Sequence, residues 1–149
     1  MAYNGTCLCG DIKFEFVFDP MMHFQCHCTI CQKVFGTSLN ALVIPEDELT
    51  CEGEIKSYTI TGGSGNLFHF NYCPKCSVVI YNKPEVLDGL IYLPAGILAD
   101  QISFKPTVEL WTDDKAEWLQ KAKTIKASFV DNGTVERIGE LLENLDQRQ

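Results

Sequence analysis

Features that would place a protein in a membrane or a secretory pathway are missing from this sequence. No run of eighteen apolar residues is present, so no membrane-spanning helix is expected. The first five residues have neither a basic start nor an apolar core, so no secretory signal is expected. These absences favour the cytoplasm, where thiols stay reduced and disulfides are rare.

The sequence also has little positive charge, and it has no internal repeat, interdomain linker or low-complexity tract. Twelve Lys and Arg residues against 20 Asp and Glu give a net charge of -8, which disfavours nucleic acid and anionic membranes as partners. The length of 149 residues fits one domain, and 46% hydrophobic residues suffice for a core. We therefore expect residues 1–149 to form a single domain.

Cysteine, in contrast, is abundant. In a reducing compartment, the eight cysteines are expected to be metal ligands or redox groups rather than a disulfide framework. Most of them fall into three clusters, which are Cys7/Cys9, Cys26/Cys28/Cys31 and Cys73/Cys76. The alternative is that these are free core thiols or disulfides, but paired C-x-C and C-x-x-C spacings favour metal binding.

Counting ligands divides the clusters into two metal sites. Cys26, Cys28 and Cys31 supply three thiolates within a short segment, which leaves one position open on a tetrahedral zinc ion. An open position is typical of a zinc ion that meets a substrate. The other two clusters together supply four thiolates, enough for a closed site that clamps the first strand to a distant segment.

Two further residues could change this count. His27 lies between two expected ligands, but adjacent side chains point in different directions, so we expect it to support the ligands or to lie at the surface. Cys51 stands alone in the sequence, and we interpret it as an unpaired strand cysteine. The alternative is that Cys51 fills the fourth position beside the triplet and makes that site structural.

Alternating patterns predict a mainly β protein. Hydrophobic residues at 12, 14, 16 and 18 predict a strand with one buried face. Further strands are expected over residues 39–44, 49–52, 55–61 and 90–94, and Gly62–Asn66 predicts a hairpin whose second strand ends at Cys73. Residues 113–121 predict a short helix. A longer C-terminal helix is expected from a stripe at helical spacing, which comprises Val135, Ile138, Leu141, Leu142 and Leu145.

On these residues, the sequence resembles the glutathione-dependent formaldehyde-activating enzyme family, which includes the domain of centromere protein V. The resemblance rests on Cys7-x-Cys9-Gly10, Cys26-His27-Cys28-x-x-Cys31, Gly53, Tyr58, Cys73-Pro74-x-Cys76 and Gly96-x-Leu98-x-Asp100. It implies a β-tent of small antiparallel sheets joined by a structural zinc ion. It also implies two zinc ions per chain, a structural one on Cys7, Cys9, Cys73 and Cys76 and a catalytic one on Cys26, Cys28 and Cys31.

The activity that the resemblance implies is that of a zinc-dependent carbon-sulfur lyase, similar to S-(hydroxymethyl)glutathione synthase, which acts on a small thiol or its aldehyde adduct. The alternative is a non-catalytic, zinc-stabilised module that binds other proteins. Assembly into a homo-oligomer is open at this point.

The chain departs from the family pattern at three places. Gln32 stands where family members commonly carry Arg, Ser77 stands where they commonly carry Gly, and Phe70-Asn71-Tyr72 replaces a frequent Arg-x-Phe. Glutathione carries two carboxylates, so its site should offer fixed cations or backbone donors. The cations near the clusters in sequence are Lys33, Lys75 and Lys83, of which Lys33 is the candidate substrate-binding residue. We therefore expect glutathione to bind weakly, and a related thiol or thioether is left open as the substrate.

Overall fold

The computed structural model describes residues 2–131, 139–140, 143 and 148, and in these ranges the chain is mainly β, with a seven-residue α-helix near the triplet and helical residues also at 139–140 and 143. The strands and helices are β1 (Tyr3–Thr6), β2 (Lys13–Phe16), β3 (Met22–Cys26), α1 (Thr29–Phe35), β4 (Leu39–Pro45), η1 (Glu46–Glu48), β5 (Thr50–Glu52), β6 (Lys56–Thr61), β7 (Leu67–Tyr72), β8 (Val79–Pro84), η2 (Glu85–Leu87), β9 (Leu90–Pro94), η3 (Ala95–Leu98), β10 (Val108–Leu110), η4 (Thr112–Asp114) and β11 (Ala127–Ser128).

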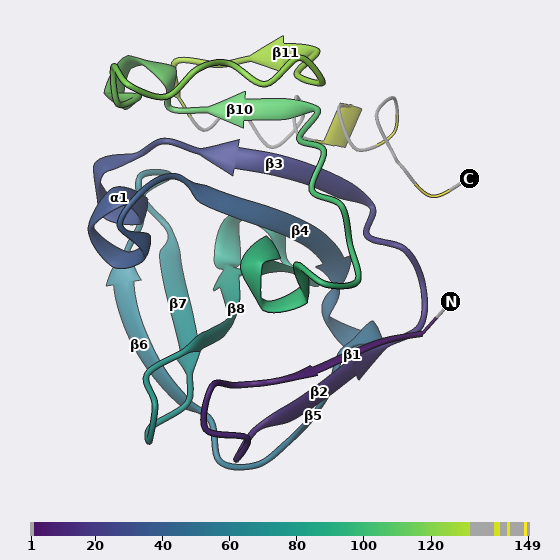
Figure 1. Cartoon of the computed structure of the whole chain (residues 1–149). Coiled ribbons are helices and arrows are strands. Elements are labelled where there is room, and N and C mark those ends of the chain that lie inside the picture. Colours follow the sequence, from purple (N-terminus) through teal and green to yellow (C-terminus); the bar gives the residue numbers. More distant parts are fainter. Residues whose placement is uncertain (1, 132–138, 141–142, 144–147, 149) are drawn as a thin grey trace.

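The strands form two sheets, as expected for the β-tent class. A small antiparallel sheet has the order β1-β2-β5, and a larger one has the order β11-β10-β3-β4-β9-β8-β7-β6. In Figure 1, β10 and β11 lie at the top, β3 and β4 cross below them, β6 and β7 lie below α1, and the three-stranded sheet lies at the bottom. The larger sheet is not purely antiparallel, because β10 pairs in parallel with both β3 and β11.

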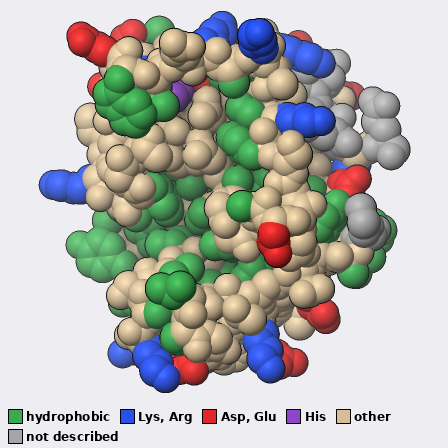
Figure 2. All heavy atoms as spheres, viewed as in Figure 1, with side chains coloured by type: hydrophobic (Ala, Val, Ile, Leu, Met, Phe, Trp, Pro, Cys, Tyr) green, Lys and Arg blue, Asp and Glu red, His purple; other side chains and the backbone are tan. Residues whose placement is uncertain are grey.

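Two hydrophobic clusters form the core, and β4 separates them. Leu42 and Ile44 belong to the first cluster, which the three-stranded sheet covers, whereas Ala41 and Val43 belong to the second, beside β3 and β10. A strand buried on both faces needs a continuous apolar run, which explains the composition of residues 39–44. Figure 2 shows hydrophobic side chains gathered in a hollow in the middle of one face, with most charged side chains at its margin.

The predicted strand over residues 12–18 is confirmed in part. Ile12, Phe14 and Phe16 are buried, but Phe18 is 60% exposed, so its expected burial is wrong. The reason is the length of the partner strand, because β1 begins at Tyr3, opposite Phe16, and offers no partner beyond it.

The predicted hairpin is confirmed. β6 and β7 pair in antiparallel register from Lys56 and Tyr72 to Thr61 and Leu67. In the turn, the Gly62 N–H donates to the Asn66 carbonyl at 2.8 Å, and Gly65 has a φ of +84°, which glycine adopts without strain. The returning strand therefore ends directly before Cys73.

The helix expected over residues 113–121 is wrong. Only η4 forms there, and Lys115 already has an extended conformation, with φ of -58° and ψ of 131°. Trp118 is 70% exposed, so it gives this segment no buried face on which a helix could pack. The residues of the predicted C-terminal stripe, Val135, Ile138, Leu141, Leu142 and Leu145, lie outside the described residues. No described helix is long and apolar enough to cross a membrane.

Candidate metal sites and the adjoining pocket

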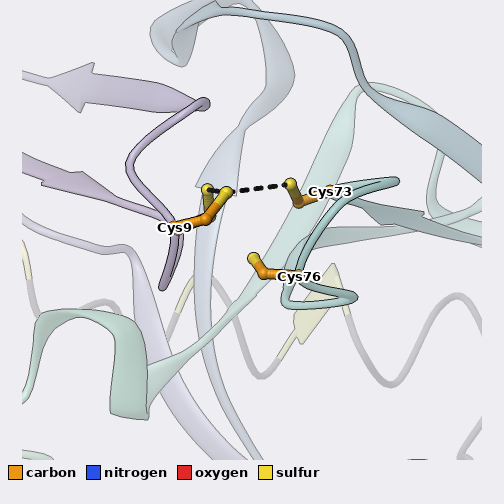
Figure 3. Close-up of side chains that lie close together, drawn as sticks. Cys9, Cys73 and Cys76 are labelled. Carbon is orange, nitrogen blue, oxygen red and sulfur yellow. Dashed lines mark hydrogen bonds between the residues drawn. The ribbon is translucent and has the colours of Figure 1, made fainter.

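A group of four cysteines joins two turns that are distant in sequence. Cys7 and Cys9 lie in the turn between β1 and β2, and Cys73 and Cys76 lie in the turn between β7 and β8. The four sulfur atoms lie within 4.8 Å of one another, with Cys7 to Cys9 at 3.5 Å and Cys9 to Cys73 at 3.7 Å. Figure 3 shows Cys9, Cys73 and Cys76 directed toward a common centre from the two loops.

The local backbone explains why both turns bring their sulfur atoms together. Gly10 has a φ of +85°, and this turn lets the Ile12 N–H donate to the Cys7 sulfur at 3.3 Å. In the second turn, the Ser77 N–H donates to the Cys73 carbonyl at 2.8 Å. Ser77 itself has a φ of +67°, in the left-handed region that favours glycine. The serine that departs from the family pattern therefore occupies a position that suits glycine better.

The chemistry of this group fits a tetrahedral metal ion. Zinc–sulfur bonds of about 2.3 Å place the sulfur atoms of a tetrahedral site about 3.8 Å apart, close to the separations found here. Hydrogen bonding from the Val78 N–H is the largest cause that lowers the pKa of Cys76, to about 6, so this sulfur is readily ionised. The four-cysteine group can therefore hold a metal ion.

The second group contains the three cysteines of the triplet. Cys26 ends β3, Cys28 is the N-cap of α1, and Cys31 lies in the first turn of this helix. Their sulfur atoms lie within 4.8 Å of one another, and the Cys31 N–H donates to the Cys28 sulfur at 3.3 Å. No other described His, Cys, Asp or Glu joins this group.

The charges of the triplet depend on one another. Hydrogen bonds from the thiols of Cys26 and Cys31 lower the pKa of Cys28 to about 3. The interaction with Cys28 in turn raises the pKa of Cys26 to about 12, and the pKa of Cys31 is raised as well. One thiolate is thus stable without a metal, whereas three thiolates side by side require a cation. The triplet can therefore also hold a metal ion.

Cys51 belongs to neither group, which agrees with its interpretation as an unpaired strand cysteine. It lies in β5 opposite Phe14 and packs against the first hydrophobic cluster. Burial raises the pKa of the Cys51 thiol to about 11, so it stays protonated at neutral pH. The fourth position beside the triplet is not filled by this residue.

His27 is not at the surface but buried, and it belongs to a polar network behind the triplet. Its Nε2 lies 3.1 Å from Oε2 of Glu109, which also accepts a hydrogen bond from the Lys115 ammonium at 3.1 Å. Burial is the largest cause that lowers the pKa of His27, so the imidazole is neutral at neutral pH. Gln32 donates its side-chain amide to the His27 carbonyl at 2.8 Å and to the Asp114 carbonyl at 2.7 Å. The glutamine that replaces the family's arginine thus ties α1 to the segment after β10.

The triplet opens onto a pocket of about 100 Å³. All three cysteines line it, together with aromatic side chains that include Phe68, Phe70, Tyr92 and Trp111. The aromatic lining was not identified from the sequence, because these residues come from β7, β9 and the segment after β10, which only the folded sheet brings together. Lys33 is exposed in the last turn of α1 and is not among the residues lining the pocket, so its contact with a substrate stays a prediction.

Comparison with known proteins identifies the family. The family model described as glutathione-dependent formaldehyde-activating enzyme matches residues 2–114, which include both cysteine groups. The chain belongs to this family. It is also similar to a solved structure of a Rhodobacter sphaeroides protein, with 14% identity over 85% of this chain and 98% of that chain and a TM-score of 0.52. That likeness supports the fold alone, and no curated protein sequence matches the chain.

Proposed function

We propose that the protein is a zinc-dependent enzyme that makes or breaks the carbon–sulfur bond between a small thiol and an aldehyde. The observation that carries this proposal is the triplet, in which three cysteine sulfur atoms without a fourth described ligand line a pocket. Catalytic zinc ions typically have three protein ligands and one open position. Membership of a family of enzymes supports the same reading.

The two cysteine groups suggest two zinc ions per chain. Cys7, Cys9, Cys73 and Cys76 form a complete tetrahedral donor set away from the pocket that the triplet lines, which suits a structural ion. Cys26, Cys28 and Cys31 provide three donors at a pocket, which suits a catalytic ion. A zinc ion there would supply Lewis-acid chemistry that stabilises a thiolate at neutral pH.

In the proposed reaction, a bond forms between the thiol sulfur and the aldehyde carbon, and the carbon–oxygen double bond becomes a single bond. The proton lost by the thiol ends on the aldehyde oxygen, so no oxidant or reductant is needed. The reverse reaction breaks the carbon–sulfur bond and returns the thiol and the aldehyde.

We propose that Tyr92 acts on the aldehyde oxygen. It lines the pocket and is only 9% exposed. Burial is the largest cause that raises the pKa of Tyr92, and the nearby charges of Cys26 and Cys31 raise it further, so the hydroxyl keeps its proton. A protonated Oη can donate a hydrogen bond to the oxygen as charge develops on it.

The test is a rate measurement on zinc-loaded protein with formaldehyde and a panel of small thiols. Exchange spectroscopy by NMR follows the interconversion of each thiol and its hydroxymethyl adduct. We expect the wild-type protein and Cys51→Ser to accelerate the exchange for at least one thiol, and Cys28→Ser to do so no longer. Equal rates for wild type and Cys28→Ser across the panel would contradict the proposal and favour a binding module.

A further inference from the structure

The pocket beside the triplet has an unusual lining for a family named after glutathione. None of the described residues that line it is Asp, Glu, Lys, Arg or His, so the thiolates of the triplet are the source of charge in this lining. Aromatic rings face it from β3, β7 and β9, contributed by Phe24, Phe68, Phe70 and Tyr92. These rings pack on one another, with Phe24 and Tyr92 edge to face at 4.9 Å between centroids and Phe68 and Phe70 at 5.1 Å.

Two of the three lysines near the cysteine clusters in sequence are held by carboxylates, and the third, Lys33, is exposed and is not among the residues lining the pocket. The Lys83 ammonium lies 2.8 Å from Glu46, and the Lys75 ammonium lies 3.4 Å from Asp11. Lys115, which is closest in sequence to the pocket residue Trp111, is bound to the buried carboxylate of Glu109. A substrate carboxylate in the pocket would therefore lose its hydration without gaining a partner of opposite charge, which is unfavourable.

The position of Trp111 shows that one wall of the pocket is fixed by the fold. Its backbone is left-handed, with φ of 57° and ψ of 45°, a conformation that costs energy for any residue except glycine. Its indole ring packs against the hairpin turn, where a Cβ on Gly63 would lie only 2.5 Å from Cζ2. A glycine and a strained tryptophan together bring a large apolar surface to the triplet.

We propose that this pocket takes a thiol whose remaining part is an uncharged aryl or branched alkyl group, and that it discriminates against thiols that carry carboxylates. The inference rests on the proposed function, because it names the substrate class of the same site. It follows from the chemistry of the lining, since aromatic walls gain from burying an apolar group and offer no charge to an anion. The net charge of -8 adds a general repulsion of anions.

The experiment compares two probes of similar length, phenylmethanethiol and 3-mercaptopropionate, together with glutathione. The two tryptophans of the chain are Trp111 and Trp118, and only Trp111 lines the pocket. In the zinc-loaded Trp118→Phe variant, the emission of Trp111 alone therefore reports binding. We expect phenylmethanethiol to bind at least tenfold more tightly than either charged thiol.

Variants locate the binding site. Trp111→Ala should weaken the binding of phenylmethanethiol at least fivefold by calorimetry, whereas Trp118→Ala, at a side chain that is 70% exposed, should leave it unchanged. If Trp111→Ala does not fold, the comparison of the three thiols on the folded protein still decides. The inference would be overturned if 3-mercaptopropionate or glutathione bound as tightly as phenylmethanethiol or more tightly. In that case, weaker binding of the charged thiol to Lys33→Ala would restore Lys33 as the substrate-binding residue.

The two proposals fail in different ways. If the charged thiols bind best and exchange with formaldehyde is accelerated, the inference falls and the proposed function stands. If phenylmethanethiol binds best but no thiol shows accelerated exchange, the pocket specificity is correct and the proposed function falls.

Discussion

The two cysteine groups differ in where their ligands come from: one draws them from two distant turns, and the other from a single short segment. The four-cysteine group joins turns in which Cys9 and Cys73 are 64 residues apart, and Cys7 and Cys73 are buried in the cluster beneath the three-stranded sheet. The triplet comes from one short segment at the end of β3, and Cys26 and Cys31 belong to the other cluster, beside the pocket. One arrangement links distant parts of the fold, and the other leaves its sulfur atoms at a cavity.

This difference determines what the loss of a metal ion should do. Structural zinc sites contribute about 10–16 kcal/mol, comparable to the whole stability of a domain, about 5–15 kcal/mol. Only a site that links distant segments adds most of this energy to the global fold, because its ligands separate on unfolding. A site within one segment stabilises mainly its own turn.

The largest expected effect is that of Cys76→Ser. It removes one of the four ligands from the group that links the two turns. Three sulfur atoms then remain to bind the metal ion. We expect insoluble or largely unfolded protein, measured by soluble yield and far-UV circular dichroism. Cys51→Ser is the matched control, because Cys51 lies outside both groups. Normal folding of Cys76→Ser would show that the two turns hold together without a metal ion.

The next largest effect is that of Glu109→Ala. It tests whether hydrogen bonds and ion pairs, rather than a metal ion, stabilise the part of the fold around the triplet. Glu109 is 3% exposed and is bound to His27, Lys115 and Ser128. Glu109→Ala leaves these groups without their partner, which typically costs about 3–5 kcal/mol for a buried ion pair. We expect a clearly lower melting temperature, whereas the exposed Glu117→Ala should melt like wild type.

The same network gives a dependence on pH. Burial alone would raise the pKa of Glu109, but hydrogen bonds from Ser128, Lys115 and His27 outweigh it and lower the pKa below its usual range. A carboxyl whose folded pKa is lowered stabilises the fold above its unfolded pKa, near 4.3 for Glu, and this contribution is lost as the pH falls through the folded value. The difference in melting temperature between wild type and Glu109→Ala should therefore shrink in acid below about pH 4. A constant difference down to pH 3 would contradict this.

Cys28→Ser should have a smaller effect on stability. Serine is itself a good N-cap, so the start of α1 keeps an acceptor in place of the Cys28 sulfur. We expect folded protein with a loss of at most about 2 kcal/mol in thermal unfolding. Elemental analysis should show about one zinc ion fewer per chain. If this variant unfolds as severely as Cys76→Ser, the triplet is structural.

The smallest effect is a gain in stability at the four-cysteine group. Ser77→Gly relieves a left-handed backbone, and the gain is limited to about 1 kcal/mol because glycine also increases the entropy of the unfolded chain. Thermal unfolding should show a slightly higher melting temperature. Ser64→Gly, in the hairpin turn at a position without a positive φ, is the control and should show no gain, because it also removes the hydroxyl that accepts a hydrogen bond from the Asn66 N–H.

The sequence predicts the local features of this protein well and its long-range features poorly. Spacing identifies the three cysteine clusters, and the apolar run at residues 39–44 identifies a strand, because both signals are carried by neighbouring residues. Joining Cys7 and Cys9 to Cys73 and Cys76 required the count of ligands and the family resemblance. The aromatic walls of the pocket were missed because Phe68 and Trp111 meet only through the strand order of the larger sheet. Whether His27 supports the ligands or lies at the surface was left open for the same reason, since its partner Glu109 is 82 residues away.

A chelator challenge of the zinc-loaded wild-type protein tests the central claim most directly, that one metal ion holds the fold and the other serves the pocket. Released zinc is followed with an indicator dye while circular dichroism follows the fold. We expect about one equivalent to leave quickly with the spectrum unchanged, and a second to leave slowly, together with unfolding. Release of both equivalents in one phase that coincides with unfolding, or of a single equivalent in total, would contradict the claim.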